Sequence, residues 1–430
     1  MFPAPHDALP LPPRPNAGQY RKLAKDLVKA YRASDAAAIP AWAERWLESL
    51  VKECGPAMPQ GNLVRPERWL LQIAEFARLK LTAKKSSPCV LADAQFVLAR
   101  LHGFDTWPEF TRHIDELKHG SSTTSTFEAA ADAIADGDLN TLLTHLLADP
   151  ELVCARSPRE HNSTLLHYVA ANGVENWRQR TPQNIVEIAV ALLDAGAEVD
   201  AVAQMYGGEC TTLGLAATSL HPERAGVQIA LLQLLLDRGA RMGRDGSAGN
   251  RHSLVGACLA NGRGQAAEFL AARGAPLDLE TAAGVGAIDA VRSYFDHEGK
   301  LKPGSSPEQL CAGFLWACEF GRTRVIEYLL GLGFDLKLQD RDGQTAMHWA
   351  VLGAQIETVR LLLKHGAPLE VKNTFGGTAL GQAIWSAIHS DSPAPYLPII
   401  EELLSAGAKI EPEMEDALAR LLRRRPGQSL

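Results

Sequence analysis

Threonine and histidine recur at one spacing in two distant parts of the sequence. His167 lies three residues after Thr164, and His348 lies three residues after Thr345. Imidazole titrates near neutral pH and is a common metal ligand, so each pair could supply a general base or a metal-binding group. The same residues could instead be structural parts of a scaffold. The elements that position them decide between these interpretations.

Polar and aromatic residues gather in two further stretches, 156–184 and 205–228. Arginine offers a planar fork for carboxylate or phosphate, tryptophan and tyrosine offer a flat apolar wall, and histidine could act as an acid or a base. A loop that is merely solvated and packed on itself is the alternative. The residues that we predict to bind a partner or ligand are His161, Asn162, Trp177, Arg178, Arg180, Tyr206, Thr211, Thr212, His221, Arg224 and Gln228.

Signatures of known catalytic sites are missing from the sequence. It contains no G-x-x-x-x-G-K-[ST], H-E-x-x-H or G-x-S-x-G, and its glycine-rich segment 243–253 lacks the lysine of a phosphate loop. The seven cysteines form no C-x-x-C, which favours reduced thiols over a zinc site. We therefore predict no catalytic residue, metal or cofactor. An enzyme is not favoured, although the sequence leaves that possibility open.

Charge and composition argue against several classes of protein, namely nucleic-acid-binding, membrane-spanning and secreted proteins. A formal net charge of −7 argues against general nucleic-acid binding. No apolar run approaches the roughly 20 residues of a membrane span. The first fifteen residues include six prolines but lack the basic and apolar regions of a signal peptide. We therefore predict a cytoplasmic protein that begins with a proline-rich, extended arm.

An internal repeat supplies the elements that position these residues. Variants of L-L-x-x-G-A end apolar stripes of helical period, and a period near 33 residues is typical of stacked supersecondary units. A glycine in this place suits a left-handed helix cap. The wide gap before residue 333 could hold a shortened unit that ends at Gly299. The other glycines are Gly196, Gly239, Gly274, Gly333, Gly366 and Gly407, at spacings of 43, 35, 59, 33 and 41.

The repeat resembles the ankyrin family. The segment "DGQTAMHWA" is similar to that family's T-P-L-H-x-A signature, with Ala346 for proline and Met347 for leucine, and "STLLHYVAANG" is similar to it with Leu165 for proline. The resemblance covers about residues 126–411. It implies that Thr164, His167, Thr345 and His348 are structural, with hydrogen bonds around the hairpin and the start of the first helix. It also implies a scaffold that binds other proteins.

The chain divides at changes of period and composition. We predict a proline-rich arm at 1–17, a helical module at 18–118, a Ser/Thr linker at 119–126, the repeats at 127–411, and a capping helix with its tail at 412–430. Within the module, "LADAQFVLARLHGFDTWPEFTRHI" resembles a helical stretch that precedes ankyrin repeats in bacterial proteins. The resemblance implies a bacterial origin but no activity.

The predicted fold is therefore all-α: a small helical module, then an ankyrin-repeat solenoid of about eight helix-pair units, some degenerate. The predicted function is a scaffold whose concave face and inserts bind a protein; we expect neither membrane nor nucleic acid as a partner. The alternative is a small-molecule-binding or catalytic protein with a polar pocket for a polar or anionic ligand. This pocket requires the two inserts, in adjacent units, to converge on one surface lined by His161, Trp177, Arg178, Tyr206, His221 and Arg224. A third insert, 385–398, is expected to be a simple loop.

Overall fold

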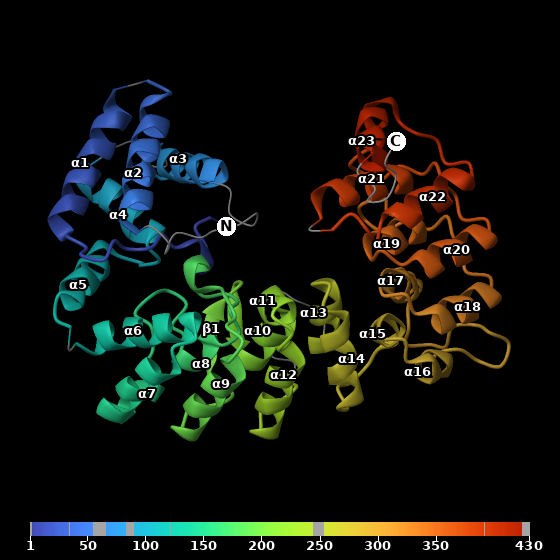
Figure 1. Ribbon diagram of the computed structural model, residues 1–430, viewed down its shortest axis with the longest axis horizontal. Helices are drawn as coiled ribbons and strands as arrows, with labels where there is room; N and C mark the ends of the chain where they lie inside the picture. The colour runs from blue at the N-terminus through green and yellow to red at the C-terminus, as the bar shows by residue number, and fades with distance from the viewer. Residues whose placement is uncertain are drawn as a thin grey trace. The chain divides into compact units, whose positions relative to one another are not determined.

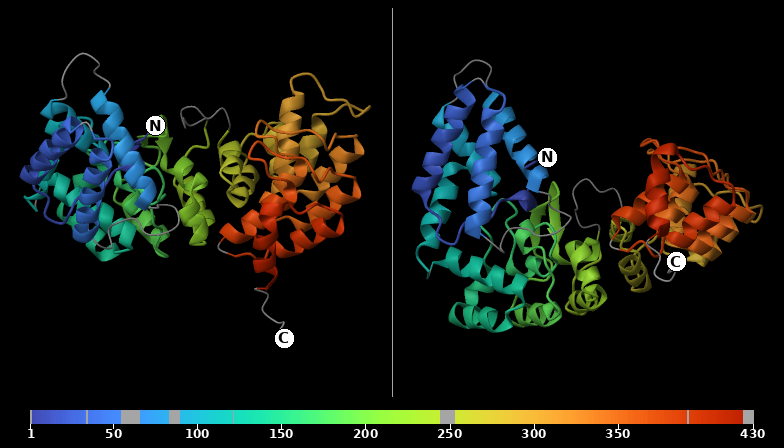
Figure 2. Two further views of the ribbon diagram at one scale, coloured as in Figure 1. Left: turned by 90° about the horizontal axis from the view of Figure 1, so that it is seen from above. Right: turned by 45° about the horizontal axis from the view of Figure 1, so that its top comes forward.

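The computed structural model describes residues 2–33, 35–54, 66–82, 90–120, 122–243, 253–390 and 392–423. These residues form two compact units, Met1–Leu254 and Val255–Leu430. The helices of both units are shown in Figure 1 and, in two further views, in Figure 2. No helix in the described part of the chain is both long and apolar enough to cross a membrane.

The first unit begins with a helical module. Its core is rich in aromatic and aliphatic side chains, including Trp42, Phe104 and Phe110. Helix α1 packs on α2 and α4, and α2 packs on α3. The bounds are η1 (Pro5–Asp7), α1 (Ala17–Arg32), α2 (Ala38–Cys54), α3 (Pro66–Thr82), α4 (Leu91–Leu101) and α5 (Trp107–Leu117).

The proline-rich arm lies against this module. The Leu9 N–H donates to the Leu101 carbonyl at 2.8 Å, and the Leu9 carbonyl lies 2.9 Å from Nδ1 of His102. Leu9 is itself buried in the core of the module. The arm is therefore an integral part of the first unit.

Helix pairs follow the module, as the repeat predicts. Within the first unit the pairs are α6 (Thr123–Asp136) with α7 (Leu139–Ala148), α8 (Leu165–Tyr168) with α9 (Ile185–Asp194), and α10 (Thr212–Thr218) with α12 (Gln228–Asp237). Helices α8 and α9 lie beside α10 and α12 (Figure 1). The shorter elements between them are η3 (Pro150–Cys154), η4 (Asn176–Arg178) and α11 (Leu220–Arg224). An antiparallel hairpin, β1 (Val202–Met205) with β2 (Gly208–Thr211), joins the second pair to the third.

The second unit continues the pattern with five pairs and a final helix. Its pairs are α13 (Leu254–Ala260) with α14 (Gly264–Ala272), α15 (Leu279–Gly284) with α16 (Ile288–Ser293), α17 (Pro307–Glu319) with α18 (Thr323–Gly331), α19 (Ala346–Leu352) with α20 (Ile356–Lys364), and α21 (Ala379–His389) with α22 (Leu397–Ser405). Helix α23 (Pro412–Arg423) packs on α21, where Leu418 and Leu421 are buried. The prediction of an all-α fold with about eight helix pairs is confirmed, and the tail 424–430 lies outside the described residues.

Three local predictions were wrong. The segment 119–126 is not a linker throughout, because the Ser122 side chain caps α6 and residues 123–126 form its first turn. Gly299 does not cap a helix, because α16 ends at Ser293 and Gly299 lies in the turn that closes the Phe295–Leu301 bridge. The insert 385–398 is not a simple loop, because its first five residues continue α21.

Candidate functional site

The repeated threonine and histidine form capping boxes at the first helices of two pairs. The Thr345 N–H donates to Nδ1 of His348 at 3.2 Å, and the Thr345 hydroxyl lies 2.9 Å from the same nitrogen. Since Nδ1 accepts a hydrogen bond, Nε2 carries the proton and donates to the Gly377 carbonyl at 3.2 Å. Burial lowers the pKa of His348, so the ring is neutral near pH 7. Both nitrogens are occupied, which leaves no free base.

The contact between threonine and histidine recurs at the second pair. The Thr164 N–H donates to Nδ1 of His167 at 3.2 Å. Burial lowers the pKa of His167 to about 4, so this ring is also neutral near pH 7. In both pairs the histidine accepts from the threonine N–H at the start of the first helix.

Replacing His348 by alanine should lower the free energy of unfolding by about 1–3 kcal/mol, because the Thr345 N–H and the Gly377 carbonyl lose their buried partner. Thermal unfolding measures the change, and the exposed His365 of the same repeat offers the control substitution His365→Ala. Binding per folded molecule should survive. Unchanged stability together with lost binding would contradict the structural role.

The first long insert folds inward and forms a buried ionic cluster. Glu175 is completely buried, and its Oε1 lies 2.7 Å from Nε of Arg159, 3.5 Å from Nη1 of Arg178 and 3.3 Å from Nε2 of His161. Burial alone would raise the pKa of Glu175, but the neighbouring Arg178, His161 and Arg159 outweigh burial and hold the pKa well below its usual range. Glu175 is therefore an anion inside the protein.

Arg178 connects the insert to helix α6. Its Nη2 lies 2.8 Å from Oε2 of Glu128, and its Nε lies 2.7 Å from Oδ1 of Asp132. The Arg178 side chain is only 3% exposed. Trp177 packs beside it, with its ring 5.7 Å from the Arg178 guanidinium carbon. Arg178 is thereby neutralised by Glu128 and Asp132, and neither Arg178 nor Trp177 offers a surface to a ligand.

The cluster also reaches the helical module. Nη1 of Arg159 donates to the His102 carbonyl at 2.8 Å, and the Arg159 guanidinium lies over the Phe104 ring at 5.3 Å. Nε2 of His113 lies 3.9 Å from Oε1 of Glu128. The module and the first repeats thus share buried charge within the first unit.

The prediction that six insert residues line one shared surface is wrong. His161, Trp177 and Arg178 are buried in the ionic cluster. Two of the carboxylates that neutralise Arg178, those of Glu128 and Glu175, are themselves buried. Tyr206 lies instead at the exposed turn of the β1–β2 hairpin, where its hydroxyl donates to the Asn172 side chain at 2.5 Å and its ring lies beside His6. His221 and Arg224 lie on α11.

The remaining predicted binding residues have separate places. Thr211 accepts a hydrogen bond as the N-cap of α10, and Thr212 is buried in that helix. The Gln228 amide donates to the carbonyls of Ala216, Ala217 and Ser219 at 2.9–3.2 Å. Arg180 pairs with Asp136 and is half exposed, and Asn162 is exposed with a φ of 50°. The alternative function needs a pocket built by both inserts. Arg178, which was predicted to line that pocket, is buried in the ionic cluster instead.

An exposed apolar surface lies on the first helices of the second unit. Helices α17, α19 and α21 pack in succession. Glu319, Leu352 and Trp385 are 33 residues apart, so they hold equivalent positions on these helices. Leu352 is 42% exposed and Trp385 is 55% exposed, with the 45% exposed Ile388 three residues further on. Burial raises the pKa of Glu319 to about 7.

A second row lies beside the first on the same helices. Trp316, Trp349 and Gln382 are again 33 residues apart. Trp349 is half-buried, and its indole N–H donates to Oδ2 of Asp340 at 2.9 Å. We call the residues Trp349, Leu352, Gln382, Trp385 and Ile388 the first-helix surface. Sequence reasoning missed it, although the 33-residue spacing of Leu352 and Trp385 was a readable signal.

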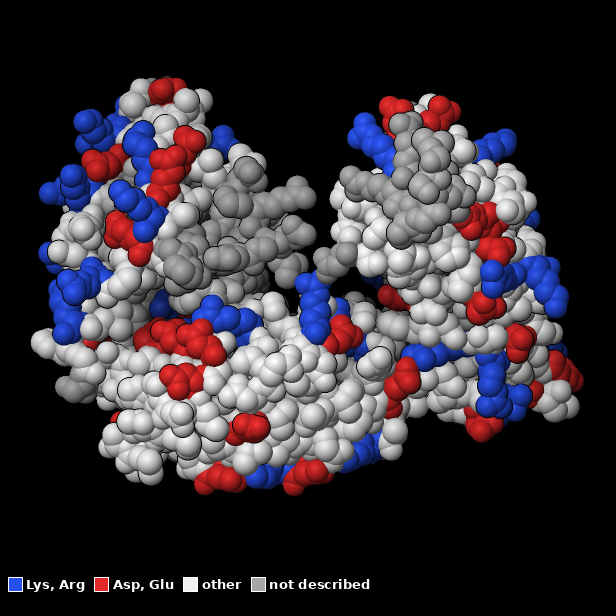
Figure 3. All heavy atoms as spheres, viewed as in Figure 1, with Lys and Arg blue, Asp and Glu red and all other residues white. Residues whose placement is uncertain are grey.

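The charged side chains of the helical module form no patch of one sign on the face drawn in Figure 3. On the face drawn in Figure 3, Lys and Arg side chains of the helical module alternate with Asp and Glu side chains. This face therefore presents no continuous field of one sign. Among the described residues, no group of three or more His, Cys, Asp or Glu side chains is placed to bind a metal ion.

Known proteins identify the repeat. The family model of ankyrin repeats (three copies) matches residues 314–414. The Notch-regulated ankyrin repeat-containing protein A of Danio rerio is 32% identical over 89 residues, which cover 20% of this chain and 70% of that protein. The chain belongs to the ankyrin-repeat family. The Notch-regulated ankyrin repeat-containing protein of Xenopus tropicalis is 29% identical over 96 residues, or 21% of this ankyrin-repeat chain and 77% of that protein.

Two further similarities cover different shares of the ankyrin-repeat chain. Inversin of Danio rerio is 41% identical over 63 residues, which are 14% of this chain but only 6% of inversin. The crystal structure of the human ASB11 ankyrin repeat domain covers 66% of this chain and 99% of its own, at 21% identity and a TM-score of 0.33.

Proposed function

We propose that this ankyrin-repeat protein is a scaffold that binds another protein through the first-helix surface of its second unit. The observation that carries the proposal is the exposure of Trp385 beside Leu352 and Ile388, at 55%, 42% and 45%. Tryptophan is enriched among the residues that dominate protein interfaces, and apolar neighbours exclude water around it. We also propose that the protein is cytoplasmic and of bacterial origin.

The contacts of Trp385 and Gln382 support a protein partner with an apolar anchor. Trp385 stacks on His389 with ring centroids 4.3 Å apart, which holds the indole in place before a partner arrives. The Gln382 amide nitrogen lies 3.4 Å from the His348 carbonyl, so the surface rests on the capping histidine of the preceding repeat. A partner that inserts aliphatic or aromatic side chains between Leu352 and Trp385 would bury both.

The proposal is tested with peptides selected from a random 16-residue display library against the full chain. Trp385→Ala should weaken the selected peptides by about 2 kcal/mol, or roughly thirtyfold, because it removes the most exposed ring of the surface. Leu332→Ala is the matched control, since Leu332 is also exposed (40%) but follows α18, a second helix. Equal binding by the two variants would refute the proposed surface.

A further inference from the structure

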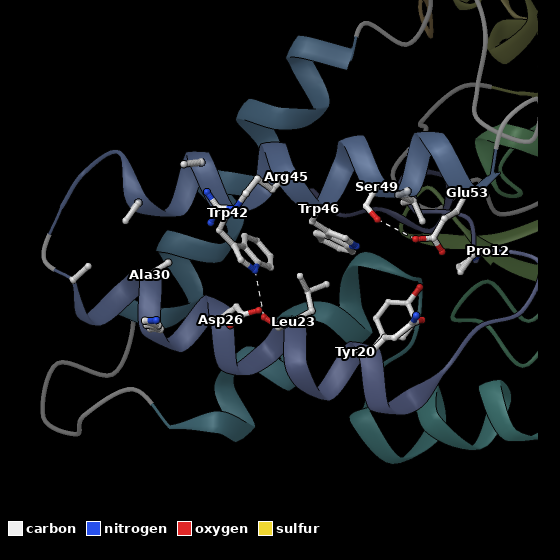
Figure 4. A pocket seen from close by; sticks show the side chains of 16 residues that line it. Pro12, Tyr20, Leu23, Asp26, Ala30, Trp42, Arg45, Trp46, Ser49 and Glu53 are labelled. Atoms are coloured by element: carbon white, nitrogen blue, oxygen red, sulfur yellow. Dashed lines mark hydrogen bonds between the residues drawn. The ribbon is translucent and has the colours of Figure 1, made fainter.

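A pocket of about 720 Å³ lies between α1 and α2 of the helical module, outside the repeats (Figure 4). Its volume falls within the range of about 300–1,000 Å³ that is usual for small-molecule sites. Trp42 and Trp46 pack with ring centroids 5.3 Å apart and stand between the two helices. The indole N–H of Trp42 donates to the Leu23 carbonyl at 3.3 Å and is thereby satisfied.

The Tyr20 hydroxyl and the Trp46 indole N–H also face the pocket. The indole N–H of Trp46 and the hydroxyl of Tyr20 make no hydrogen bond within the described part of the chain, although these residues are only 7% and 5% exposed. Figure 4 shows both groups directed toward the end of the pocket where Glu53 and Pro12 lie. Neither group is among the fully enclosed polar atoms that lack a partner in the described residues, so both open onto the pocket, where a bound molecule can pair with them.

The donors and acceptors at the Glu53 end of the pocket define the chemistry of the bound molecule. An indole N–H can only donate, so the occupant must offer an acceptor to Trp46. The Glu53 carboxylate can only accept, and it receives one hydrogen bond, from the Ser49 hydroxyl at 2.9 Å. It therefore has room for a donor from the occupant. The Tyr20 hydroxyl can serve either role.

Charge around the pocket is balanced. Its lining includes the carboxylates of Asp26 and Glu53 and the cations of Lys29 and Arg45, while its body is apolar, with Leu23 and Leu50 among the lining residues. A balanced rim favours a neutral ligand over an ion. A carboxamide offers an acceptor oxygen and a donor N–H on neighbouring atoms without a charge.

We propose that the pocket between α1 and α2 binds a small, largely apolar molecule that carries a carboxamide or lactam group. The carbonyl accepts from the Trp46 N–H, the amide N–H donates to Glu53, and the Tyr20 hydroxyl completes the contacts. The apolar body lies along the wall formed by Leu23, Trp42 and Leu50. This site is independent of the first-helix surface and gives the helical module a function of its own.

The experiment uses the full chain with ¹⁵N-labelled tryptophan indoles, whose eight resonances are recorded by NMR. Trp46→Phe assigns the Trp46 signal. The probe is 3-phenylpropanamide, and 3-phenylpropanoate and 3-phenylpropylamine are its matched acceptor-only and donor-only analogues. We expect the amide to shift the Trp46 indole proton saturably and to bind at least about tenfold more tightly than either analogue.

Two variants separate a ligand contact from a structural role. Tyr20→Phe should weaken the amide about fivefold, the cost of one hydrogen bond. Because the Tyr20 hydroxyl has no partner in the described protein, its removal should leave thermal stability unchanged. Glu53→Ala should weaken the amide about tenfold, whereas Glu48→Ala, an exposed position of α2 that does not line the pocket, should not.

The absence of a saturable shift at Trp46 would overturn the proposal, as would equal binding of the three probes or unchanged binding by Tyr20→Phe and Glu53→Ala. A second arm uses the peptide acetyl-Phe-Gln-Phe-amide, which carries the same carboxamide on a peptide. If it bound more than about tenfold more tightly than 3-phenylpropanamide, the occupant would be a peptide and the assignment to a free small molecule would be wrong.

Discussion

Replacing Arg178 by alanine should lower the free energy of unfolding of the first unit by about 3–5 kcal/mol. The guanidinium neutralises Glu128 and Glu175, with N–O distances of 2.8 and 3.5 Å, and Glu175 is completely inaccessible to solvent. Without Arg178, both carboxylates share the guanidinium of Arg159, so one buried negative charge loses its compensation. An uncompensated buried charge costs more than the ion pair itself contributes. Urea denaturation followed by circular dichroism and tryptophan fluorescence measures the change.

Arg180→Ala is the matched control for this prediction. Arg180 lies two residues along the same insert and pairs with Asp136, but its side chain is 46% exposed. Exposed ion pairs contribute less than about 1 kcal/mol, so this variant should unfold almost like the wild type. Equal losses in the two variants would show that Arg178 does not hold the cluster together. Because the chain has two units, the transitions are fitted separately.

The second large effect is expected for Gly353→Ala. Gly353 is the C-cap of α19. Its φ of −76° is a conformation open to any residue, so backbone strain does not require glycine there. A Cβ atom at this position would lie 1.8 Å from the carbonyl oxygen of Glu319, at the end of α17. Backbone atoms cannot rotate away as a side chain can, and the two helices would have to separate. We expect a loss of about 3 kcal/mol or more, at the upper end of the cost of overpacking.

The control for this substitution is Gly331→Ala in the neighbouring repeat. Gly331 is the last residue of α18, and no atom lies within 4 Å of a Cβ added there. Alanine is favoured over glycine in helices by up to about 1 kcal/mol, so this variant should be as stable as the wild type or more so. Thermal melting of the two variants should give shifts of opposite sign. A Gly353→Ala variant as stable as the wild type would contradict the close approach of α17 and α19.

Local sequence patterns determined most of the repeat architecture. The spacing of Thr345 and His348 is sufficient to form a capping box, because both side chains act within the first turn of one helix. The stripe that includes Val359 and Leu362 marks the buried face of α20 by its period alone. These features depend on neighbours within a few residues, so the number of helix pairs and the capping contacts of the motif histidines could be predicted from the sequence.

The location of the charged insert depended on partners distant in sequence. Arg178 and Arg180 are the same residue type two positions apart, yet one is buried and the other is half exposed. Glu128, fifty residues earlier, determines the difference by supplying a buried carboxylate to Arg178. A lone arginine in a long loop is usually solvated, and nothing in its immediate sequence indicates a buried anion.

At both candidate binding sites, the sequence determines some features and the tertiary packing determines the others. The 33-residue spacing of Leu352 and Trp385 determines that they occupy equivalent positions, but only the packing of α19 and α21 shows that this face stays exposed. The pocket lies between α1 and α2, and the two polar groups that we assign to its ligand, on Tyr20 and Trp46, come one from each helix. Periodicity predicts that each helix has a buried face. Whether a hydroxyl or an indole N–H finds a partner there depends on how the two faces meet, and this is a property of the tertiary structure alone.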